Sequence, residues 1–177
     1  MARRNYWPLL ALLALATLPL ALAMLSYFGG IGVPVGRVNQ GQLVLTPTAV
    51  ASWQLRVSDG EPWQGQGRWQ LLLVVERCED GCLAWQYTLG QLHKALGRDR
   101  QRVERQLVLP RAAAEGVTAN GVIANKAVFV SAGVAASNQG IWLVDPLGNL
   151  VLRYRLDQPP QALFKDLKRL LKVSNVG

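Results

Sequence analysis

The two cysteines of this chain, Cys78 and Cys82, are the residues whose type and spacing predict chemistry. They follow the apolar run Leu71–Val75 and come just before a stretch with helical periodicity. The N-terminal end of a helix stabilises a thiolate, which is the form of cysteine that attacks disulfides and binds soft metal ions. A cysteine pair between a strand and a helix therefore predicts a redox site or a metal site.

The residues alone leave three uses of this pair open. Outside the cytoplasm it could be a reversible dithiol–disulfide that exchanges with a partner protein. The two thiolates could instead hold Cu(I), a soft ion for which two sulfur ligands suffice. The third use is an inert structural disulfide, although so small a ring constrains little of the unfolded chain. His93, the only histidine, lies about three turns and about 16 Å along the predicted helix from Cys82, so it cannot bind the same ion.

The residues around Cys82 predict the helix that positions the pair. Apolar side chains recur at intervals of three and four residues and therefore share one helix face: Cys82, Trp85, Leu89, Leu92 and Leu96. Asp80 is placed to cap the start of this helix and Gly97 to end it. Trp85 is predicted to be a core residue rather than a recognition residue.

Strands are predicted on both sides of this helix. Trp69–Val75 is apolar without alternation, as in a strand covered on both faces, and Val103–Leu109 is the next expected strand. Earlier in the chain, Trp53–Val57 alternates and is followed by turn residues 58–62, which predicts a hairpin. Residues 111–126 are rich in Ala, Gly and Asn and predict only a short helix or a loop.

The last third of the chain predicts a hairpin and a helix. Ile141–Val144 and Leu150–Tyr154 flank the turn residues 145–149, and a short strand is expected at 128–130. Pro159-Pro160 opens a helix with leucines on one face and cations near its C-terminal end. The order hairpin, strand, helix, strand, hairpin, helix predicts an α/β sandwich of the thioredoxin-like class.

The N-terminus predicts one transmembrane helix. Residues 7–28 carry no charge, and about 20 apolar residues cross the hydrocarbon core. Arg3 and Arg4 precede this run, so the positive-inside rule predicts a cytoplasmic N-terminus and an exported domain. The alternative is a signal peptide cleaved after Ala23, within the small-x-small pattern Ala21-Leu22-Ala23. The apolar run is longer than the core of a signal peptide and continues beyond that site, which favours a retained anchor.

Three regions are thus predicted along the chain. They are a cytoplasmic tip and transmembrane anchor over 1–28, a glycine- and proline-punctuated linker over 29–50, and an exported thioredoxin-like domain over 51–177. Together they predict the fold class: an α/β thioredoxin-like sandwich preceded by one N-terminal transmembrane helix.

The chain is basic, with a formal net charge of +8. Much of the charge of the exported part lies at five positions: Lys94, Arg98, Arg100, Arg102 and Arg105. Such a surface could meet anionic lipid headgroups or an acidic partner protein, but a solvated loop and strand edge is the simpler interpretation and is the one adopted. Nucleic acid is excluded as a partner because the compartment is wrong and no aromatic residues are interleaved with the basic ones.

With these elements in place, the chain resembles the Sco/SenC cytochrome oxidase assembly proteins, which are membrane-anchored thioredoxin-like domains with a Cys-x-x-x-Cys site. The anchor, the segment Gly67–Leu96 and the hairpin segment Ile141–Val151 carry the resemblance, and a Lys/Leu-rich terminal helix follows as in that family. The resemblance implies that Cys78 and Cys82 are either two thiolate ligands for copper or the redox pair that reduces the cysteines of another protein.

The family completes its copper site with a histidine a few residues before the hairpin strand, where this chain has Ala136-Ser137-Asn138-Gln139-Gly140. The chain is therefore interpreted as a divergent relative that requires no cofactor. In the alternative interpretation, Cys78 and Cys82 bind Cu(I). We expect thiol–disulfide exchange in which Cys78 attacks and Cys82 resolves. A non-catalytic assembly protein with a structural disulfide, or a Cu(I) chaperone, is the alternative function.

The resemblance also implies partners and a location. The partner would be a cytochrome oxidase subunit or another oxidase assembly factor. The location would be the bacterial inner membrane, held by residues 7–28, with the C-terminal domain on the periplasmic side.

Overall fold

The computed structural model describes residues 6–29, 39–65, 67–118 and 127–174, without the side chains of 115–118. The chain divides into two compact units, Met1–Val38 and Asn39–Gly177. The described part of the first unit is one helix, α1 (Trp7–Gly29), which has no charged residue and no buried side chain. At a rise of 1.5 Å per residue its length is about 35 Å, enough to cross the hydrocarbon core. The apolar helix expected over 7–28 is present, and its length and composition fit a membrane span.

The second unit is built around a six-stranded sheet. In chain order its elements are β1 (Gln42–Leu43), η1 (Val50–Trp53), β2 (Trp69–Val74), α2 (Asp80–Ala95), η2 (Gly97–Arg102), β3 (Val103–Pro110), α3 (Arg111–Thr118), β4 (Ala127–Val130), α4 (Ala132–Ser137), β5 (Gly140–Val144), β6 (Leu150–Tyr154) and α5 (Pro160–Val173). The strand order is β1-β6-β5-β2-β3-β4. β2 pairs with β3, and β3 with β4, in parallel, whereas β5 runs antiparallel to β2 and to β6.

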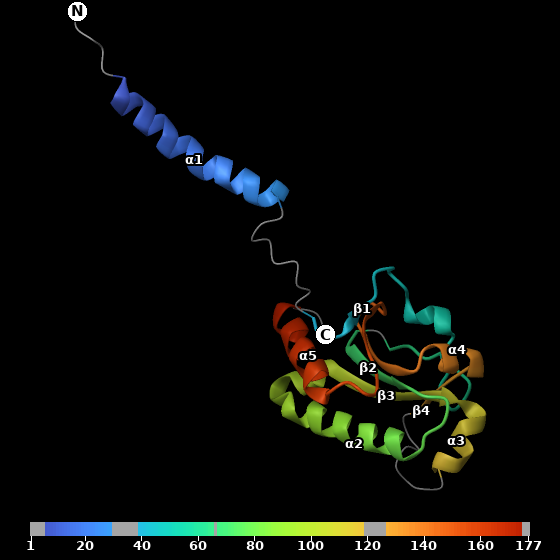
Figure 1. The fold of residues 1–177 in the computed structure, drawn as a ribbon. Helices are drawn as coiled ribbons and strands as arrows, with labels where there is room; N and C mark the ends of the chain where they lie inside the picture. Colours follow the sequence, from blue (N-terminus) through green and yellow to red (C-terminus); the bar gives the residue numbers. More distant parts are fainter. Residues whose placement is uncertain (1–5, 30–38, 66, 119–126, 175–177) are drawn as a thin grey trace, which may run out of the picture. The chain divides into compact units, whose positions relative to one another are not determined.

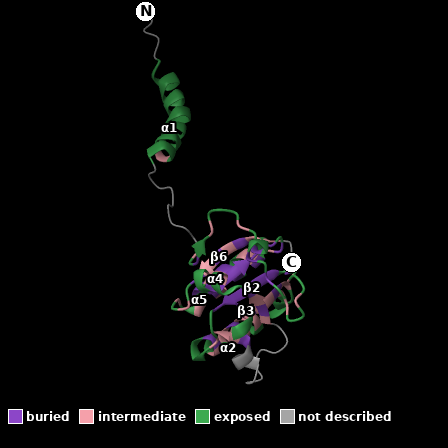
Figure 2. Ribbon diagram, turned by 90° about the vertical axis from the view of Figure 1, so that its right-hand side faces the viewer, coloured by how far each residue is buried: buried purple, intermediate pink, exposed green. Residues whose placement is uncertain are grey.

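The two faces of the sheet carry separate apolar cores. On one face α2 and α5 cover the strands, and Leu89 and Leu167 are among the side chains packed there (Figure 1). On the other face η1 and α4 close a smaller core around Trp142, whose ring meets Trp53 edge-on at 5.2 Å between centroids. The central strands β2 and β5 are fully buried, and the outer faces of the helices are exposed (Figure 2). All six residues of the central strand β2 are buried, which shows that both of its faces are covered.

The predicted α/β thioredoxin-like fold class is confirmed. The apolar face expected for α2 is also present: Cys82, Leu89 and Leu96 are buried, and Trp85 and Leu92 pack against the same core. The hairpin of β5 and β6 forms around the predicted turn, where Asp145 Oδ1 accepts the backbone N–H of Leu147 at 2.9 Å and of Asn149 at 2.8 Å.

Two local predictions are wrong. Trp53–Val57 is not a strand: Trp53 ends η1, and Gln54 takes a left-handed backbone with φ of 51° that interrupts any extended run. The predicted hairpin turn does form: Arg56 bridges Pro62 in an antiparallel pairing, and the Val57 N–H donates to Glu61 O at 2.9 Å. Asp80 is the first residue of α2 rather than its cap. Glu79 takes the capping position without a side-chain hydrogen bond to the helix.

The sequence also missed short elements. η2 was expected as loop and no element was predicted where α4 lies, and β1 with the start of η1 lies inside the segment 29–50 that was expected to be linker. Residues 30–38 of that segment lie outside the described residues, as do residues 119–126 of the expected short helix or loop. The predicted domain limits remain predictions.

A buried carboxylate fixes the start of the second unit. Asp166 Oδ2 in α5 accepts the backbone N–H groups of Gln40 at 2.7 Å and Gly41 at 2.9 Å, and the hydroxyl of Tyr154 at 2.8 Å. A Cβ at Gly41 would lie 2.5 Å from Tyr154 Cζ, so only glycine fits beside this ring. Burial, followed by the hydrogen bond and charge of Asp166, raises the pKa of Tyr154 well above its usual value.

Candidate functional site

The junction of β2 and α2 places the two cysteines together. The backbone N–H of Val75 donates to Val108 O at 3.0 Å, so the chain stays on the sheet through Val75 and leaves it immediately afterwards. Cys78 lies in the short connection that follows, and Cys82 lies in the first turn of α2. The predicted pair is therefore at the end of a fully buried strand and at the start of a helix, as the sequence indicated.

Cys78 and Cys82 form a disulfide with 5.0 Å between their Cα atoms. Cys82 is buried, with 5% of its surface exposed, and belongs to the core beneath α2. Cys78 is half-buried and packs against the same core. Cys78 is thus the more exposed partner, as its place in the loop predicted.

A hollow of about 430 Å³ lies beside the disulfide, and we call it the disulfide groove. It is lined by Val75, Glu76, Arg77, Glu79, Gly81, Cys82, Trp85, Gln139 and Leu156. The indole N–H of Trp85 donates to Leu156 O at 3.0 Å, which joins α2 to the segment after β6. The side-chain amide of Gln139 donates to the Glu76 carboxylate, and Gln139 O accepts from Arg153 Nη2 at 2.9 Å. The walls of the groove are therefore tied to one another across three segments of the chain.

Charges of both signs surround the groove. Arg77 Nε lies 3.4 Å from Glu79 Oε1, and both side chains are nearly fully exposed at 80% and 78%, so solvent screens this pair. Glu79 reaches toward Arg77 and makes no hydrogen bond to the start of α2. A groove with a polar rim beside the disulfide can accept a polypeptide segment that carries its own cysteine.

The described residues add no third metal ligand to the two cysteines. No group of three or more His, Cys, Asp or Glu side chains that could hold a metal occurs among the described residues. The two sulfur atoms are bonded to each other. In the segment 136–140, where the resemblance to the Sco/SenC proteins predicts a histidine, Gln139 lines the groove and donates its amide to Glu76. A carboxamide engaged in this way is not a soft ligand for Cu(I).

The only histidine has a structural role. The Nε2–H of His93 donates to Arg100 O at 2.9 Å and to Val103 O at 2.8 Å. These bonds join the last turns of α2 to η2 and to the start of β3. His93 is therefore separate from the cysteine pair, as the helical rise predicted.

Sequence reasoning missed the groove residues other than the cysteines. Gln139 was noted only as part of the segment 136–140, which lacks a histidine, and no sequence signal pointed to Glu76 or Leu156. Gln139 and Leu156 reach the groove from segments that only the folded sheet brings beside it, whereas Glu76 lies two residues before Cys78. The catalytic roles assigned to Cys78 and Cys82 remain predictions.

Comparison with known proteins places the second unit in a family. A family model described as "transmembrane-like, thioredoxin-like, C-terminal domain" matches residues 69–174, from the start of β2 to just past α5. No curated protein matches the sequence.

Solved structures with a similar fold include Sco proteins and a thiol-disulfide oxidoreductase. Apo Sco1 from Thermus thermophilus has a TM-score of 0.55 at 18% identity, covering 77% of this chain and 99% of that chain. Yeast Sco1 with copper bound has a TM-score of 0.53 at 12% identity, covering 78% and 96%. The thioredoxin domain of a thiol-disulfide oxidoreductase from Bacteroides vulgatus has a TM-score of 0.50 at 11% identity, covering 76% and 99%. At these identities the similarity shows the fold alone.

Proposed function

The chain belongs to the transmembrane-like, thioredoxin-like C-terminal domain family, and we propose that it exchanges disulfides with a partner protein on the exported side of a membrane. The observation that carries the proposal is the closed Cys78–Cys82 bond at the start of α2, with the disulfide groove beside it. A half-buried and a buried sulfur at a helix start suit a nucleophile and a resolving thiol. In the solvent-exposed groove a partner segment would lie within reach of the pair.

The exchange needs only the two cysteines and a partner disulfide. The Cys78 thiolate attacks one partner sulfur, and the other partner sulfur leaves as a thiolate that takes up a proton. The Cys82 thiolate then attacks Cys78 Sγ in the mixed disulfide, which releases the second partner thiol and forms the Cys78–Cys82 bond. Two electrons pass from this chain to the partner, and the disulfide in the structure is the oxidised end of that cycle.

The finer proposal concerns the partner and the compartment. The resemblance to the Sco/SenC proteins supports a role in the assembly of a copper-containing terminal oxidase, with an oxidase subunit or another assembly factor as the partner. The apolar helix α1, with Arg3 and Arg4 before it, supports a single-pass anchor in a bacterial inner membrane with the second unit in the periplasm.

The redox step is tested on the purified full chain in detergent. The chain is equilibrated with mixtures of reduced and oxidised glutathione, and free thiols are counted by the mass added with a maleimide reagent. We expect the Cys78–Cys82 bond to open and close over the range of potentials found outside the cytoplasm. Cys82→Ser should accumulate a mixed disulfide through Cys78. A bond that stays closed throughout would contradict the exchange mechanism.

The role in the cell is tested by oxidase activity in membranes. We expect Cys78→Ser to lower the oxidase level as far as deletion of the whole gene does. A normal level in the double variant Cys78→Ser/Cys82→Ser, with loss only on deletion, would replace the redox role by the non-catalytic assembly function. The Cu(I) chaperone alternative is tested by anaerobic Cu(I) titration of the reduced chain. Stoichiometric binding would support that alternative, and no binding would rule it out.

A further inference from the structure

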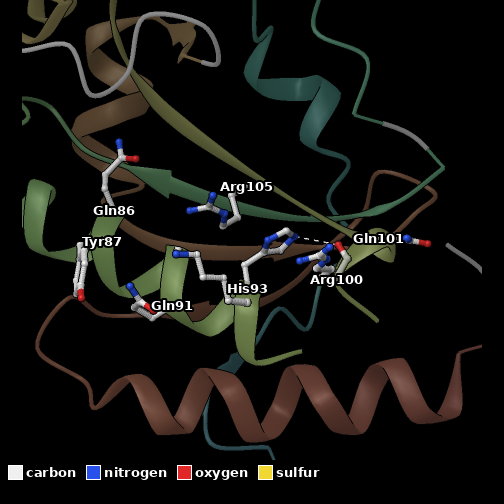
Figure 3. A pocket seen from close by; sticks show the side chains of 9 residues that line it. Gln86, Tyr87, Gln91, His93, Arg100, Gln101 and Arg105 are labelled. Carbon is white, nitrogen blue, oxygen red and sulfur yellow. Dashed lines mark hydrogen bonds between the residues drawn. The ribbon is translucent and has the colours of Figure 1, made fainter. Parts of the chain in front are cut away.

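Three cations meet in a second hollow, of about 550 Å³, on the side of α2 that faces η2 and the start of β3. We call it the basic hollow. Its positively charged lining residues are Lys94 of α2, Arg100 of η2 and Arg105 of β3 (Figure 3). Gln86 and Gly90 of α2 also line it. No Asp or Glu is among its lining residues in the described part of the chain.

Arg105 is the unusual member because it points toward the core. Side chains alternate along a strand, and its neighbours on the same face, Val103 and Leu107, are buried beneath α2. Arg105 itself is half-buried. Among the described residues, β4 pairs with Leu107–Pro110 and no strand pairs with the first half of β3 on that side.

Gly90 makes room for the guanidinium on the helix. A Cβ at this position would lie 3.2 Å from Arg105 Nη1, which is closer than ordinary contact, so a larger residue would push the side chain away. Figure 3 shows Arg105 reaching over α2 beside His93, with Gln86 further along the same helix. Arg105 is thus held at the hollow by the shape of α2.

Several polar side chains of the basic hollow have no partner among the described residues. Among the described residues, the side chains of Lys94, Arg100 and Arg105 take part in no ion pair. Gln86 Nε2 is a buried donor without an acceptor. A half-buried cation without a counter-charge and a buried donor without an acceptor both cost stability. An anion bound by Arg105 would supply the counter-charge that this guanidinium lacks.

We propose that the basic hollow binds a phosphate group. Guanidinium groups present paired N–H donors that match phosphate oxygens, and a hollow lined by one sign of charge concentrates anions. The sequence analysis interpreted these residues as a solvated loop and strand edge. That interpretation fits the exposed Lys94 and Arg100 but not the half-buried Arg105, and the phosphate site replaces it. The phosphate belongs to a small solute or to the headgroup of an anionic lipid.

The test uses the full chain in nanodiscs of neutral phosphatidylcholine. Its unfolding temperature is followed by tryptophan fluorescence while inorganic phosphate replaces chloride at constant ionic strength. We expect phosphate to raise the unfolding temperature because it binds only the folded chain. In Arg105→Gln the apparent affinity should fall roughly tenfold, the loss expected for one charge-assisted hydrogen bond. Lys94→Gln, an exposed position that tolerates change, should weaken binding in the same direction.

The matched control is Arg98→Gln, which removes the same charge from η2 but from a residue outside the hollow lining. It should bind phosphate as the unchanged chain does. A second arm uses nanodiscs that contain phosphatidylglycerol. If phosphatidylglycerol stabilises the chain in an Arg105-dependent way and free phosphate does not, the ligand is a lipid headgroup. If free phosphate stabilises it and phosphatidylglycerol does not, the ligand is a small solute.

The proposal is overturned if neither probe stabilises the chain, or if Arg98→Gln and Arg105→Gln weaken binding equally. The hollow contains neither cysteine, so the double variant Cys78→Ser/Cys82→Ser should bind phosphate unchanged. The failure of this proposal is therefore distinguishable from a failure of the exchange mechanism.

Discussion

At the scale of single residues, the chemistry of this protein depends on where polar groups are buried. Cys82 is buried in the core and Cys78 is only half-buried, so a partner meets Cys78 more readily than Cys82. Asp166 shows the structural counterpart. It is 4% exposed, yet it accepts three hydrogen bonds that tie α5 to Tyr154 and to the first residues of the second unit.

Tyr154 provides a prediction about stability at high pH. The unfolded chain releases a tyrosine proton near about pH 10, whereas burial and Asp166 keep the proton on Tyr154 in the folded chain. This contribution is therefore constant below about pH 10, and above it the free energy of unfolding falls by up to about 1.4 kcal/mol per pH unit. Tyr154→Phe should remove that dependence and cost about 1–2 kcal/mol at neutral pH for the lost hydrogen bond.

Urea unfolding of the full chain in detergent, at pH values from about 8 to about 11, measures this difference. Tyr87→Phe is the control, because Tyr87 is 70% exposed on α2 and its profile should run parallel to that of the unchanged chain. Identical slopes for Tyr154→Phe and the unchanged chain above pH 10 would contradict the prediction.

At the scale of elements, the predictable parts are those whose signal is local. α2 follows from its apolar spacing, and the β5–β6 hairpin follows from Asp145, whose carboxylate accepts two backbone N–H groups of its own turn. η2, α4 and β1 could not be predicted, since they are short and depend on contacts made only in the folded sheet. The same holds for the site: the cysteine pair has a sequence signature, whereas Glu76 and Gln139 meet from distant segments.

The packing of α2 is tested by Leu89→Ala. Leu89 is 3% exposed and lies on the helix face that also carries Cys82. Its truncation should lower the free energy of unfolding by about 2–5 kcal/mol through lost burial and a cavity. Tyr87→Ala on the exposed face of the same helix should change it by about 0.5 kcal/mol or less. Equal losses for the two variants in denaturant unfolding would show that α2 does not pack as described.

At the scale of the whole molecule, the second unit contains everything that its fold requires. Both cores are formed by residues after Asn39, and α1 has no buried side chain. We therefore expect a fragment of residues 39–177 to be soluble without detergent and to unfold in one cooperative transition. Its midpoint should match that of the same unit in the full chain. A fragment that aggregates or lacks a transition would show that the unit depends on the preceding residues.

A fragment that starts at Leu45 tests where the domain begins. It keeps η1 but loses the two backbone N–H groups that Asp166 accepts, together with β1, which pairs with β6. A buried carboxylate left with Tyr154 as its remaining donor costs about 1–3 kcal/mol, and β6 becomes an unprotected sheet edge that invites aggregation. We expect residues 45–177 to unfold at lower urea than residues 39–177. Equal midpoints would instead favour the linker that the sequence predicted to run to residue 50, because β1 and Asp166 would then add nothing to the folded domain.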